Sequence, residues 1–515
     1  MGRPESPSGV RASSPHTTTI CFTTQDLAQF SAASGDRNPL HVSEQYARAS
    51  PYDEPVVFGM LGVLTILGHF PDRPKQRLRH LSVEFRNPLT VGVPYRVEIV
   101  EPSADRAVAK IYDAARLMLK ASMTFGPDHQ DRHEMAEQDT AGLAEAADHT
   151  KSHLRAGTRV TGRYAPSIKE LRQLVDRWKL SEKGATMSDV SAMMWASYAV
   201  GMELPGKRAV FWRLELTFPA GEETGQSPLT YEITVQSYDE RLDLLHTAGT
   251  LSLGTSTCAT TEMWAFVRED SPRPSLHRLT TLLPRSNRLK DKVALVIGGS
   301  RGLGAAITQA LASQGCTVFL NYLHCGEEAE QIRTSLGDAS ELIELTQGDA
   351  SDIDWCRTLQ QHIVQRHGGL DVLICNASPP IRPLPFVPEK VAQFQTFLAQ
   401  SVALVSMPMS TFLSDLAQRS GWNVLISSAF VRDLPAEWPH YATAKCALEG
   451  LAQWAAIQNP TVHSLIVRPP KLLTDQTNTT VGRHGAMGIE RAAAAIVKQL
   501  ICPDRPPAIQ ILDTF

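Results

Sequence analysis

The stretch LKDKVALVIGGSRGLGAAITQAL, residues 289–311, places an apolar strand, a glycine-rich turn and a helix in immediate succession. Its glycines at 298, 302 and 304 have the spacing Gly-x-x-x-Gly-x-Gly. Glycine permits a tight turn, and it lets backbone N–H groups at the start of the helix come close to a pyrophosphate. The stretch therefore predicts the opening strand, turn and helix of a parallel sheet that binds a dinucleotide.

Polar residues further along the chain follow predicted strands at regular spacing. Gly348-Asp349 and Asn376-Ala377 each come after such a strand. Ser428 ends the run WNVLISS, Tyr441 follows thirteen residues later, and Lys445 lies one helical turn beyond Tyr441. A lysine on the same helix face lowers the pKa of the phenol, so that Tyr441 can exchange a proton near neutral pH.

This set of residues resembles the short-chain dehydrogenase/reductases, and the resemblance covers residues 288–515. It implies an α/β Rossmann-type domain with a doubly wound parallel sheet. It also implies that Ser428 hydrogen-bonds the substrate carbonyl, that Tyr441 and Lys445 handle the proton, and that a nicotinamide passes a hydride to the same carbon.

The segment Asn321-Tyr322-Leu323-His324 indicates which nicotinamide is bound, because it has no Asp or Glu at the ribose position. An acidic residue there would hydrogen-bond the 2′-OH of NAD and repel a 2′-phosphate. Arg301 in the glycine turn is suited to pair with that phosphate, so we expect NADP(H). The residues expected to contact the cofactor are Gly298, Ser300, Arg301, Gly302, Leu303, Gly304, Asn321, Tyr322, Asp349, Ala350, Asn376, Ala377, Tyr441, Lys445, Pro469 and Thr474.

The sequence departs from this family's pattern at four places, one of which is the missing Asp-Gly-Gly ending. The family's Asn-Ala-Gly is Asn376-Ala377-Ser378 here, and its Pro-Gly is Pro469-Pro470. The helix that normally supplies an asparagine to a proton relay offers Gln400 or Ser401 instead. The relay is therefore altered, whereas Ser428 and the Tyr–Lys pair are retained.

A second motif lies near the other end of the chain, in SGDRNPLHVSEQYARASPYDEPVVFGML, residues 34–61. Asp36 and His41 stand on either side of Pro39, which prevents a continuous helix that would separate them by roughly 140°. A carboxylate and an imidazole that share one water can move a proton at Cα and handle a hydroxyl at Cβ of a thioester. Gly59 opens an apolar helix whose free N–H groups suit a developing oxyanion.

The motif, together with Tyr46-Ala47 and Phe85-Arg86-Asn87-Pro88, resembles the MaoC-like (R)-specific enoyl-CoA hydratases. That resemblance implies a hot-dog fold, in which Asp36 and His41 are the acid/base pair and Asn38 helps to fix the water. Phe58 stands where the family usually has a histidine.

Residues 155–268 repeat the order of a helix followed by alternating strands but lack the Asp-x-Asn-Pro-x-His motif. We therefore expect an α+β double hot-dog whose second half shapes a tunnel. The expected organisation is a tail at 1–16, a catalytic hot-dog at 17–127, a linker at 128–154, a degenerate hot-dog at 155–268, a linker at 269–287 and the reductase domain at 288–515.

Composition limits the remaining classes of function. The chain has 515 residues, 43% of them hydrophobic and 20% charged, and a net charge of −4, which indicates a multi-domain globular protein without a general attraction to nucleic acid. Its 8 cysteines are scattered, which favours reduced thiols over disulfides or a metal site. With no signal-like segment and no long apolar run in the sequence, we expect a cytoplasmic protein that does not enter a membrane.

The basic run DRPKQRLRH contains Arg73, Lys75, Arg77 and Arg79. It is either a solvated loop or a surface for the phosphates of CoA or the acidic face of an acyl carrier protein.

Together the two resemblances predict a bifunctional enzyme: an NADPH-dependent 3-oxoacyl-thioester reductase and a (3R)-3-hydroxyacyl-thioester dehydratase, in fatty-acid or polyketide-type chain building. The alternatives are hydration followed by oxidation, as in β-oxidation, a single-activity chain whose other half is a scaffold in a larger synthase, and a reductase for a carbonyl unrelated to acyl thioesters. We expect an acyl thioester on CoA or a carrier protein as substrate and a homodimer or homotetramer as the assembly.

Overall fold

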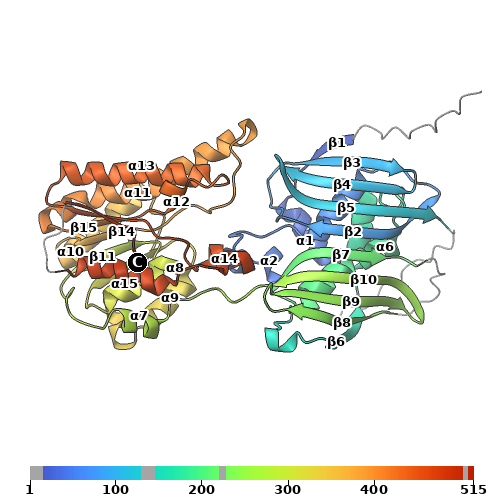
Figure 1. The fold of residues 1–515 in the computed structure, drawn as a ribbon, viewed down its shortest axis with the longest axis horizontal. Helices are drawn as coiled ribbons and strands as arrows, with labels where there is room; N and C mark the ends of the chain where they lie inside the picture. The colour runs from blue at the N-terminus through green and yellow to red at the C-terminus, as the bar shows by residue number, and fades with distance from the viewer. Residues whose placement is uncertain (1–15, 129–144, 220–227, 503–507) are drawn as a thin grey trace, which may run out of the picture. The chain divides into compact units, whose positions relative to one another are not determined.

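The computed structural model describes residues 16–128, 145–219, 228–502 and 508–515 of the chain (Figure 1). These residues form two compact units, 1–269 and 270–515, each with its own core. The predicted tail at 1–16 lies outside the described residues except for His16, where the first strand begins.

The first unit is built on one ten-stranded antiparallel sheet with the order β1-β3-β4-β5-β2-β7-β10-β9-β8-β6. Its two halves have the same topology, since strands one to five are ordered 1-3-4-5-2 and strands six to ten are ordered 6-8-9-10-7. The strands are β1 His16–Ile20, β2 Gln76–Phe85, β3 Tyr95–Ser103, β4 Arg106–Asp113, β5 Arg116–Pro127, β6 Arg159–Tyr164, β7 Ala209–Thr217, β8 Leu229–Asp239, β9 Leu244–Leu253 and β10 Ser256–Val267.

Each half of the sheet packs against one apolar helix. Helix α4 (Gly59–Gly68) precedes β2 and α6 (Met187–Tyr198) precedes β7, and nearly every side chain of both helices is buried. Helix α4 is apolar on all sides, which requires this central position. The other helical segments are α1 Thr24–Ser34, α2 Pro39–Val42, α3 Glu44–Arg48, η1 Lys151–His153, α5 Ile168–Arg177 and the π-helical turn η2 Ala199–Glu203.

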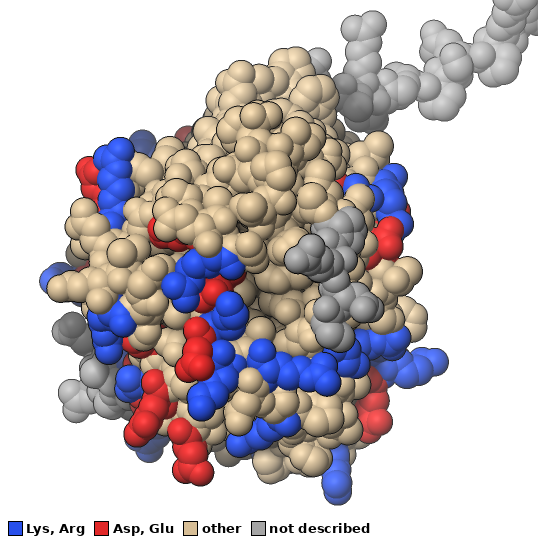
Figure 2. Space-filling view, turned by 90° about the vertical axis from the view of Figure 1, so that its left-hand side faces the viewer, with Lys and Arg blue, Asp and Glu red and all other residues tan. Residues whose placement is uncertain are grey.

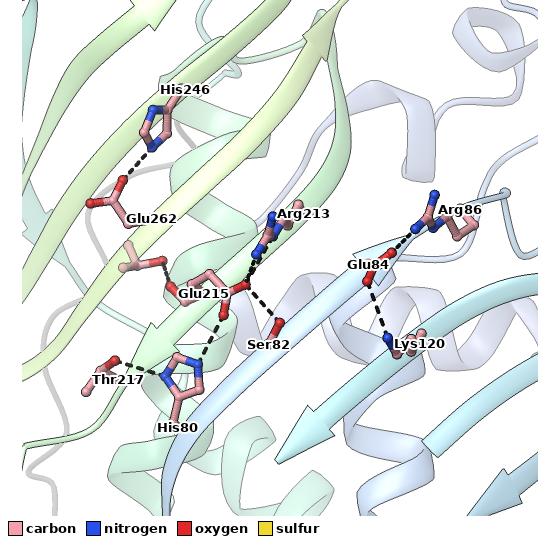
Figure 3. Close-up of polar contacts among 11 residues, drawn as sticks. His80, Ser82, Glu84, Arg86, Lys120, Arg213, Glu215, Thr217, His246 and Glu262 are labelled. Atoms are coloured by element: carbon pink, nitrogen blue, oxygen red, sulfur yellow. Dashed lines mark hydrogen bonds and ion pairs between the residues drawn. The ribbon is translucent and has the colours of Figure 1, made fainter. Parts of the chain in front are cut away.

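The halves join where β2 pairs with β7, from His80 opposite Thr217 to Glu84 opposite Arg213. Figure 3 shows the polar side chains over this joint, where Glu215 accepts hydrogen bonds from Ser82 and Arg213 and contacts His80. Hydrogen bonds and ion pairs therefore connect the two halves on the outer face of the joint. On the inner face, which packs against the helices, the side chains are apolar.

On the helix side of the joint, the two halves are linked by an ion pair. Arg77 on β2 donates to Asp189 on α6, with Nη2 2.8 Å from Oδ1, and the Asp189 side chain is 1% exposed. The Asp189 carboxylate also accepts from the backbone N–H of Thr186, as part of a capping box.

Two of the four members of the basic run fit neither alternative given for it, a solvated loop or a docking surface. Besides the Arg77 pair, the buried side chain of Arg73 contacts Glu101 and donates to the Ala104 carbonyl. These guanidinium groups are used within the fold, because a buried charge is retained only when it is paired.

The second unit contains a seven-stranded parallel sheet with the order β13-β12-β11-β14-β15-β16-β17. The strands are β11 Val293–Ile297, β12 Thr317–Tyr322, β13 Ile343–Gln347, β14 Val372–Cys375, β15 Trp422–Ile426, β16 His463–Val467 and β17 Ile509–Leu512. Alternate residues of these strands enter two separate cores, one on each face, as in a doubly wound sheet.

Helices cover both faces of this sheet (Figure 1). One face carries α7 Leu276–Leu282, α8 Gly302–Ala312, α9 Gly326–Thr334 and α15 Ile489–Leu500, and the other carries α10 Ile353–His367, α11 Val391–Arg419 and α13 Pro439–Gln458. Shorter segments are η3 Gly337–Leu342, η4 Pro388–Lys390, α12 Phe430–Asp433, η5 Asp475–Thr477 and α14 Thr480–Arg483.

Two elements differ from what the sequence predicted. The expected linker at 269–287 contains α7, whose Leu279 is fully buried in the core of the second unit. Residues 388–419 form a helix that is long and apolar enough to cross a membrane by length and composition alone. That helix packs its buried residues Phe397, Val405, Phe412 and Leu416 within the unit, as the core helix of a globular domain does.

The Arg77–Asp189 pair provides a test of how the two halves depend on each other. We expect Arg77→Ala to lower the free energy of unfolding by about 3–5 kcal/mol, because it leaves a buried carboxylate without its counter-charge. Urea unfolding of the full chain measures the change. The exposed neighbour Lys75 is the control, and Lys75→Ala should change stability by less than about 0.5 kcal/mol. Equal effects of the two substitutions would contradict the role of the pair.

Candidate functional site

The predicted dinucleotide crevice lies where the strand order reverses, between β11 and β14. The turn after β11 has Gly298 at φ +74° and Gly302 at φ +52°, and a Cβ on Gly304 would overlap the carbonyl oxygen of Gly298. These positions therefore require glycine. Helix α8 begins at Gly302 without a side-chain cap, so its first N–H groups are available to an anion.

Two asparagines hold the glycine turn in place. Asn376 donates from Nδ2 to the Gly298 carbonyl at 2.9 Å. Asn321 accepts from the Gly298 N–H at 3.3 Å and donates to the Gly348 carbonyl at 3.0 Å. Asn321 is 3% exposed. We therefore propose that it positions the turn, instead of contacting the cofactor as its place in the sequence predicted.

The remaining predicted cofactor residues surround the same turn. Thr474 lies 3.5 Å from where a Cβ on Gly302 would be, and Ala377 lies 3.1 Å from the equivalent point on Gly298. Arg301 pairs with Asp475 at 3.4 Å, a partner that the sequence analysis missed. Ser300, Leu303 and Ala350 are buried, Tyr322 is half-buried, the exposed Asp349 accepts from Ser351, and the Pro469 carbonyl accepts from the Ala429 N–H.

Ser428, Tyr441 and Lys445 come together at the carboxyl end of β15 and on α13. The phenol of Tyr441 hydrogen-bonds Ser428, and Lys445 Nζ lies 5.5 Å from the Tyr441 ring centroid while donating to the Ile426 carbonyl at 2.7 Å. Burial raises the pKa of Tyr441 to about 12, against a smaller opposite effect of the Ser428 hydrogen bond. Burial lowers the pKa of Lys445 to about 8. The predicted lowering of the phenol pKa by Lys445 is therefore wrong for this structure: burial raises the pKa of Tyr441, and the effect that opposes burial is the Ser428 hydrogen bond.

The altered relay positions lie on α11. Gln400 is exposed, whereas Ser401 is buried and its hydroxyl has no hydrogen-bond partner among the described residues.

In the first unit, Asp36 lies between α1 and α2 and is 1% exposed. Its Oδ1 accepts from the Asn38 N–H at 3.0 Å, and its Oδ2 accepts from the Ser197 hydroxyl at 2.8 Å. Burial raises the pKa of Asp36 to about 6, although both hydrogen bonds act in the opposite direction. This carboxyl group can therefore exchange a proton near neutral pH.

His41 lies on α2, which Pro39 begins and Asn38 caps. Its Nδ1 is 2.7 Å from the Val56 carbonyl, so Nδ1 carries the proton and Nε2 is left as a base. Burial lowers the pKa of His41 to about 4, and the nearby charge of Arg268 acts in the same direction. Its ring stacks on Phe58 at 4.0 Å between centroids.

Asn38 makes contacts other than the predicted one, whereas Gly59 keeps the uncapped helix start on which its predicted role depends. Asn38 donates from Nδ2 to the carbonyls of Gly201 and Gly206, both at 3.0 Å, and accepts from the Leu40 N–H. We therefore propose that it positions the loop instead of the water. Gly59 starts α4 without a side-chain cap, as predicted for an oxyanion site. The close neighbour that requires glycine there is the Phe85 ring, 2.5 Å from where a Cβ would be, and not a substrate.

The sequence analysis missed that the second half of the unit completes the Asp36 site. Ser197 supplies a hydrogen bond, and a Cβ on Gly201 would lie 2.6 Å from Asp36 Oδ1. Neither residue belongs to a motif, so only the fold connects them with Asp36.

Comparison with known families decides the identity of the two units. The family model of MaoC like domains matches residues 7–117, and the model of short chain dehydrogenases matches residues 292–481. The chain joins a MaoC-like domain to a short-chain dehydrogenase domain. The second half of the first unit, from residue 145 onwards, lies outside both matches.

Relatives of the short-chain dehydrogenase domain include general stress protein 39 of Bacillus subtilis, 33% identical over 18% of this chain and 32% of that protein. Hydroxynaphthalene reductase arp2 of Aspergillus fumigatus is 29% identical over 33% of this chain and 61% of that protein. The chain thus aligns with less than two thirds of either relative. A short-chain dehydrogenase of Burkholderia cenocepacia, solved in complex with NADP, is 26% identical over 44% of this chain and 98% of its own, with a TM-score of 0.40.

The environment of His41 in the MaoC-like domain leads to a measurable titration. We expect the His41 imidazole to remain neutral at pH 6 and to gain a proton only near pH 4, because its ring is buried. The unfolded chain binds this proton near pH 6.5, so His41 makes the domain lose stability as the pH falls from about 6.5 towards 4. Side-chain ¹⁵N NMR, assigned with His41→Gln, measures the titration. If His41 titrated in the folded chain as it does in the urea-unfolded chain, the lowering of its pKa by burial would be contradicted.

Proposed function

We propose that the chain is a bifunctional enzyme in which the short-chain dehydrogenase domain reduces 3-oxoacyl thioesters and the MaoC-like domain dehydrates the resulting (3R)-3-hydroxyacyl thioesters to trans-2-enoyl thioesters. The observation that carries this proposal is the presence in one chain of the Ser428–Tyr441–Lys445 cluster and the Asp36–His41 pair. The product of the first reaction is the substrate of the second. Joining the two sites raises the local concentration of the shared intermediate.

The cofactor of the reductase domain is NADP(H) in this proposal. The glycine turn and the uncapped start of α8 fit a pyrophosphate. The end of β12 has no acidic side chain to repel a 2′-phosphate. The Arg301 guanidinium lies in the glycine turn after β11, directly before α8. Similar solved structures hold NADP or NADPH as their ligand.

In the reduction, NADPH held at the glycine turn and the start of α8 would be the source of the hydride for the C3 carbonyl carbon. Ser428 donates a hydrogen bond to the carbonyl oxygen, and Tyr441 gives that oxygen its proton as the C–H bond forms. Because burial raises the pKa of Tyr441 to about 12, the phenol is protonated at neutral pH and ready to act as the acid. The Lys445 ammonium then stabilises the phenolate that remains.

In the dehydration, the neutral His41 takes the Cα proton at Nε2, and protonated Asp36 gives its proton to the C3 hydroxyl, which leaves as water. The electron pair of the Cα–H bond forms the double bond between Cα and Cβ. The N–H groups at the start of α4 stabilise the negative charge that develops on the thioester oxygen. Transfer of the proton from His41 to Asp36 restores the starting state. Hydration follows the same steps in reverse.

Two alternatives use the same residues. The first alternative is the reverse order, hydration followed by oxidation. The lack of an acidic residue after β12 favours NADP(H) over NAD, and NADPH usually serves as a reductant, so this feature argues against the oxidative direction. A scaffold role for one half would have no need of its acid/base pair. Both Tyr441–Lys445 and Asp36–His41 are present.

Aromatic side chains around Tyr441 favour a second candidate substrate for the reductase domain, a ketone that bears a ring. Phe430 and Phe397 have ring centroids 5.9 and 6.4 Å from that of Tyr441, and Trp438 lies 6.3 Å from Phe430. Flat aromatic surfaces bind flat aromatic ligands well. The names of two relatives, hydroxynaphthalene reductase arp2 and versicolorin reductase stcU, point to such substrates for those proteins.

The proposed partners are an acyl thioester on CoA or a carrier protein and a second copy of the chain, in the cytoplasm. Exposed apolar side chains on α11 and α13 suit self-association, with Trp454 and Ile457 55% and 65% exposed. Figure 2 shows few charged side chains on the upper part of this face of the molecule, at the height of α11 and α13 in Figure 1.

Separate variants test the two sites. With acetoacetyl thioester and NADPH, we expect wild type to give 3-hydroxybutyryl and crotonyl thioesters. Tyr441→Phe should lower reduction on the order of 10²–10⁴-fold and spare crotonyl hydration, because it removes only the proton donor of reduction. Asp36→Asn should have the opposite effect, so that 3-hydroxybutyryl thioester accumulates.

Nicotinamide absorbance and mass spectrometry of the thioesters follow both steps, and circular dichroism checks that the variants fold. Loss of both activities in either folded variant would contradict the existence of two independent sites.

Trp438 distinguishes the two candidate substrates of the reductase domain. If the natural ketone bears a ring, Trp438→Ala should lower kcat/KM for a hydroxynaphthalene-type ketone at least about 10-fold, through lost ring contact, and leave acetoacetyl thioester nearly unchanged. Val364, exposed on α10, gives the control Val364→Ala. An equal loss for both ketones would remove the support for the ring-bearing substrate.

A further inference from the structure

Helix α13 carries a further inward-facing ionisable residue, Glu449, one turn beyond Lys445 and two turns beyond Tyr441. The three side chains meet three consecutive residues at the end of β15. Tyr441 hydrogen-bonds Ser428, Lys445 donates to the Ile426 carbonyl at 2.7 Å, and Glu449 accepts from the Ser427 hydroxyl at 2.5 Å. Glu449 is therefore held by the same strand end that places the predicted catalytic residues.

The Glu449 carboxylate is buried, with its side chain 8% exposed, and it is fully ionised. Arg468, which follows β16, donates to it from Nε at 2.9 Å and from Nη2 at 2.6 Å. This bidentate pair and the Ser427 hydrogen bond hold the pKa of Glu449 below its usual value despite burial. A permanent negative charge thus stands inside the unit, next to the helix turn that bears Lys445.

Lys445 needs such a charge, because the residue is only 5% exposed. The other ionisable groups that face it are the Tyr441 phenol on its own helix and the Cys375 thiol at the end of β14. Both are neutral near pH 7, since burial raises the pKa of each to about 12. Glu449 therefore supplies the negative charge that faces Lys445, and Arg468, itself close to Asp513, offsets part of it.

We propose that Glu449 is a positioning residue that keeps the Lys445 ammonium charged in the buried site, and that Arg468 tunes the strength of this support. The proposal rests on the reductase function proposed above, in which charged Lys445 stabilises the Tyr441 phenolate. Without Glu449, burial alone would act on Lys445, and the ammonium would lose its proton at a lower pH.

The test is the pH dependence of ketone reduction in the full chain. Reduction should fall as the pH rises through the pKa of Lys445, which lies at about 8. Glu449→Gln should move this alkaline fall about one pH unit lower and leave kcat/KM at pH 6.5 nearly unchanged, because glutamine retains an acceptor for Ser427. Arg468→Gln should move the fall to higher pH, because it removes a positive charge from the neighbourhood of Lys445.

Shifts of opposite sign distinguish this role from a structural one. If Glu449 served only to hold the helix, each substitution would lower activity by a factor that does not change with pH. That result would overturn the proposal. Glu437→Gln, the loss of an exposed carboxylate just before α13, should leave the profile unchanged. If Arg468→Gln fails to fold, the double variant Glu449→Gln/Arg468→Gln replaces it, and its shift should be smaller than that of Glu449→Gln alone.

Binding of NADPH provides a readout that does not depend on the ketone. Lys445 is among the predicted cofactor residues, so NADPH affinity, measured by nicotinamide fluorescence, should weaken above pH 8 and at lower pH in Glu449→Gln. If wild type bound NADPH in this way but reduced no thioester, the proposed substrate would be wrong while the role of Glu449 would stand. If the binding profile were the same in wild type and Glu449→Gln, the role of Glu449 would be wrong.

Discussion

A carboxylate that leaves water has to meet hydrogen-bond donors or a positive charge, and this requirement links the two halves of the MaoC-like unit. Asp36 belongs to the first half and receives a hydrogen bond from Ser197 of the second. Asp189 belongs to the second half and receives Arg77 of the first. Each half therefore satisfies a charge that the other has buried, and the continuous sheet through β2 and β7 holds these contacts in register.

The second half has the fold of the first although it lacks the Asp-x-Asn-Pro-x-His motif. Its strands follow the order of the first half, and its helix α6 is as fully buried as α4. The two halves differ in the residues that they place next to the Asp36 carboxylate. Where the first half presents Asp36 and His41, the second presents Ser197 and Gly201, one a hydrogen-bond donor and the other an open space for the carboxylate. The second half thus forms part of the immediate surroundings of Asp36.

Much of this architecture was predictable from local sequence. The glycine spacing at 298–304 indicated the crevice because only glycine fits those backbone positions, and the thirteen-residue interval from Ser428 to Tyr441 indicated the cluster on β15 and α13. Contacts between distant segments were not predictable. Arg73 and Arg77 looked like a solvated or docking surface because Glu101 and Asp189 are remote in sequence. Helix α7 was hidden by the prolines around it, and Arg468 near Glu449 resembles any residue after a strand.

The reciprocal contacts between the halves also determine how this chain can be recombined. A crossover placed between residues 128 and 154 would fall in what looks like a linker, yet it would separate Asp36 from Ser197 and Arg77 from Asp189. The smallest compact unit that keeps all of these partners together is residues 1–269. A domain exchange should therefore be made at the boundary between the two compact units. The two halves, which share one strand order and one continuous sheet, therefore have to be exchanged together as a single unit.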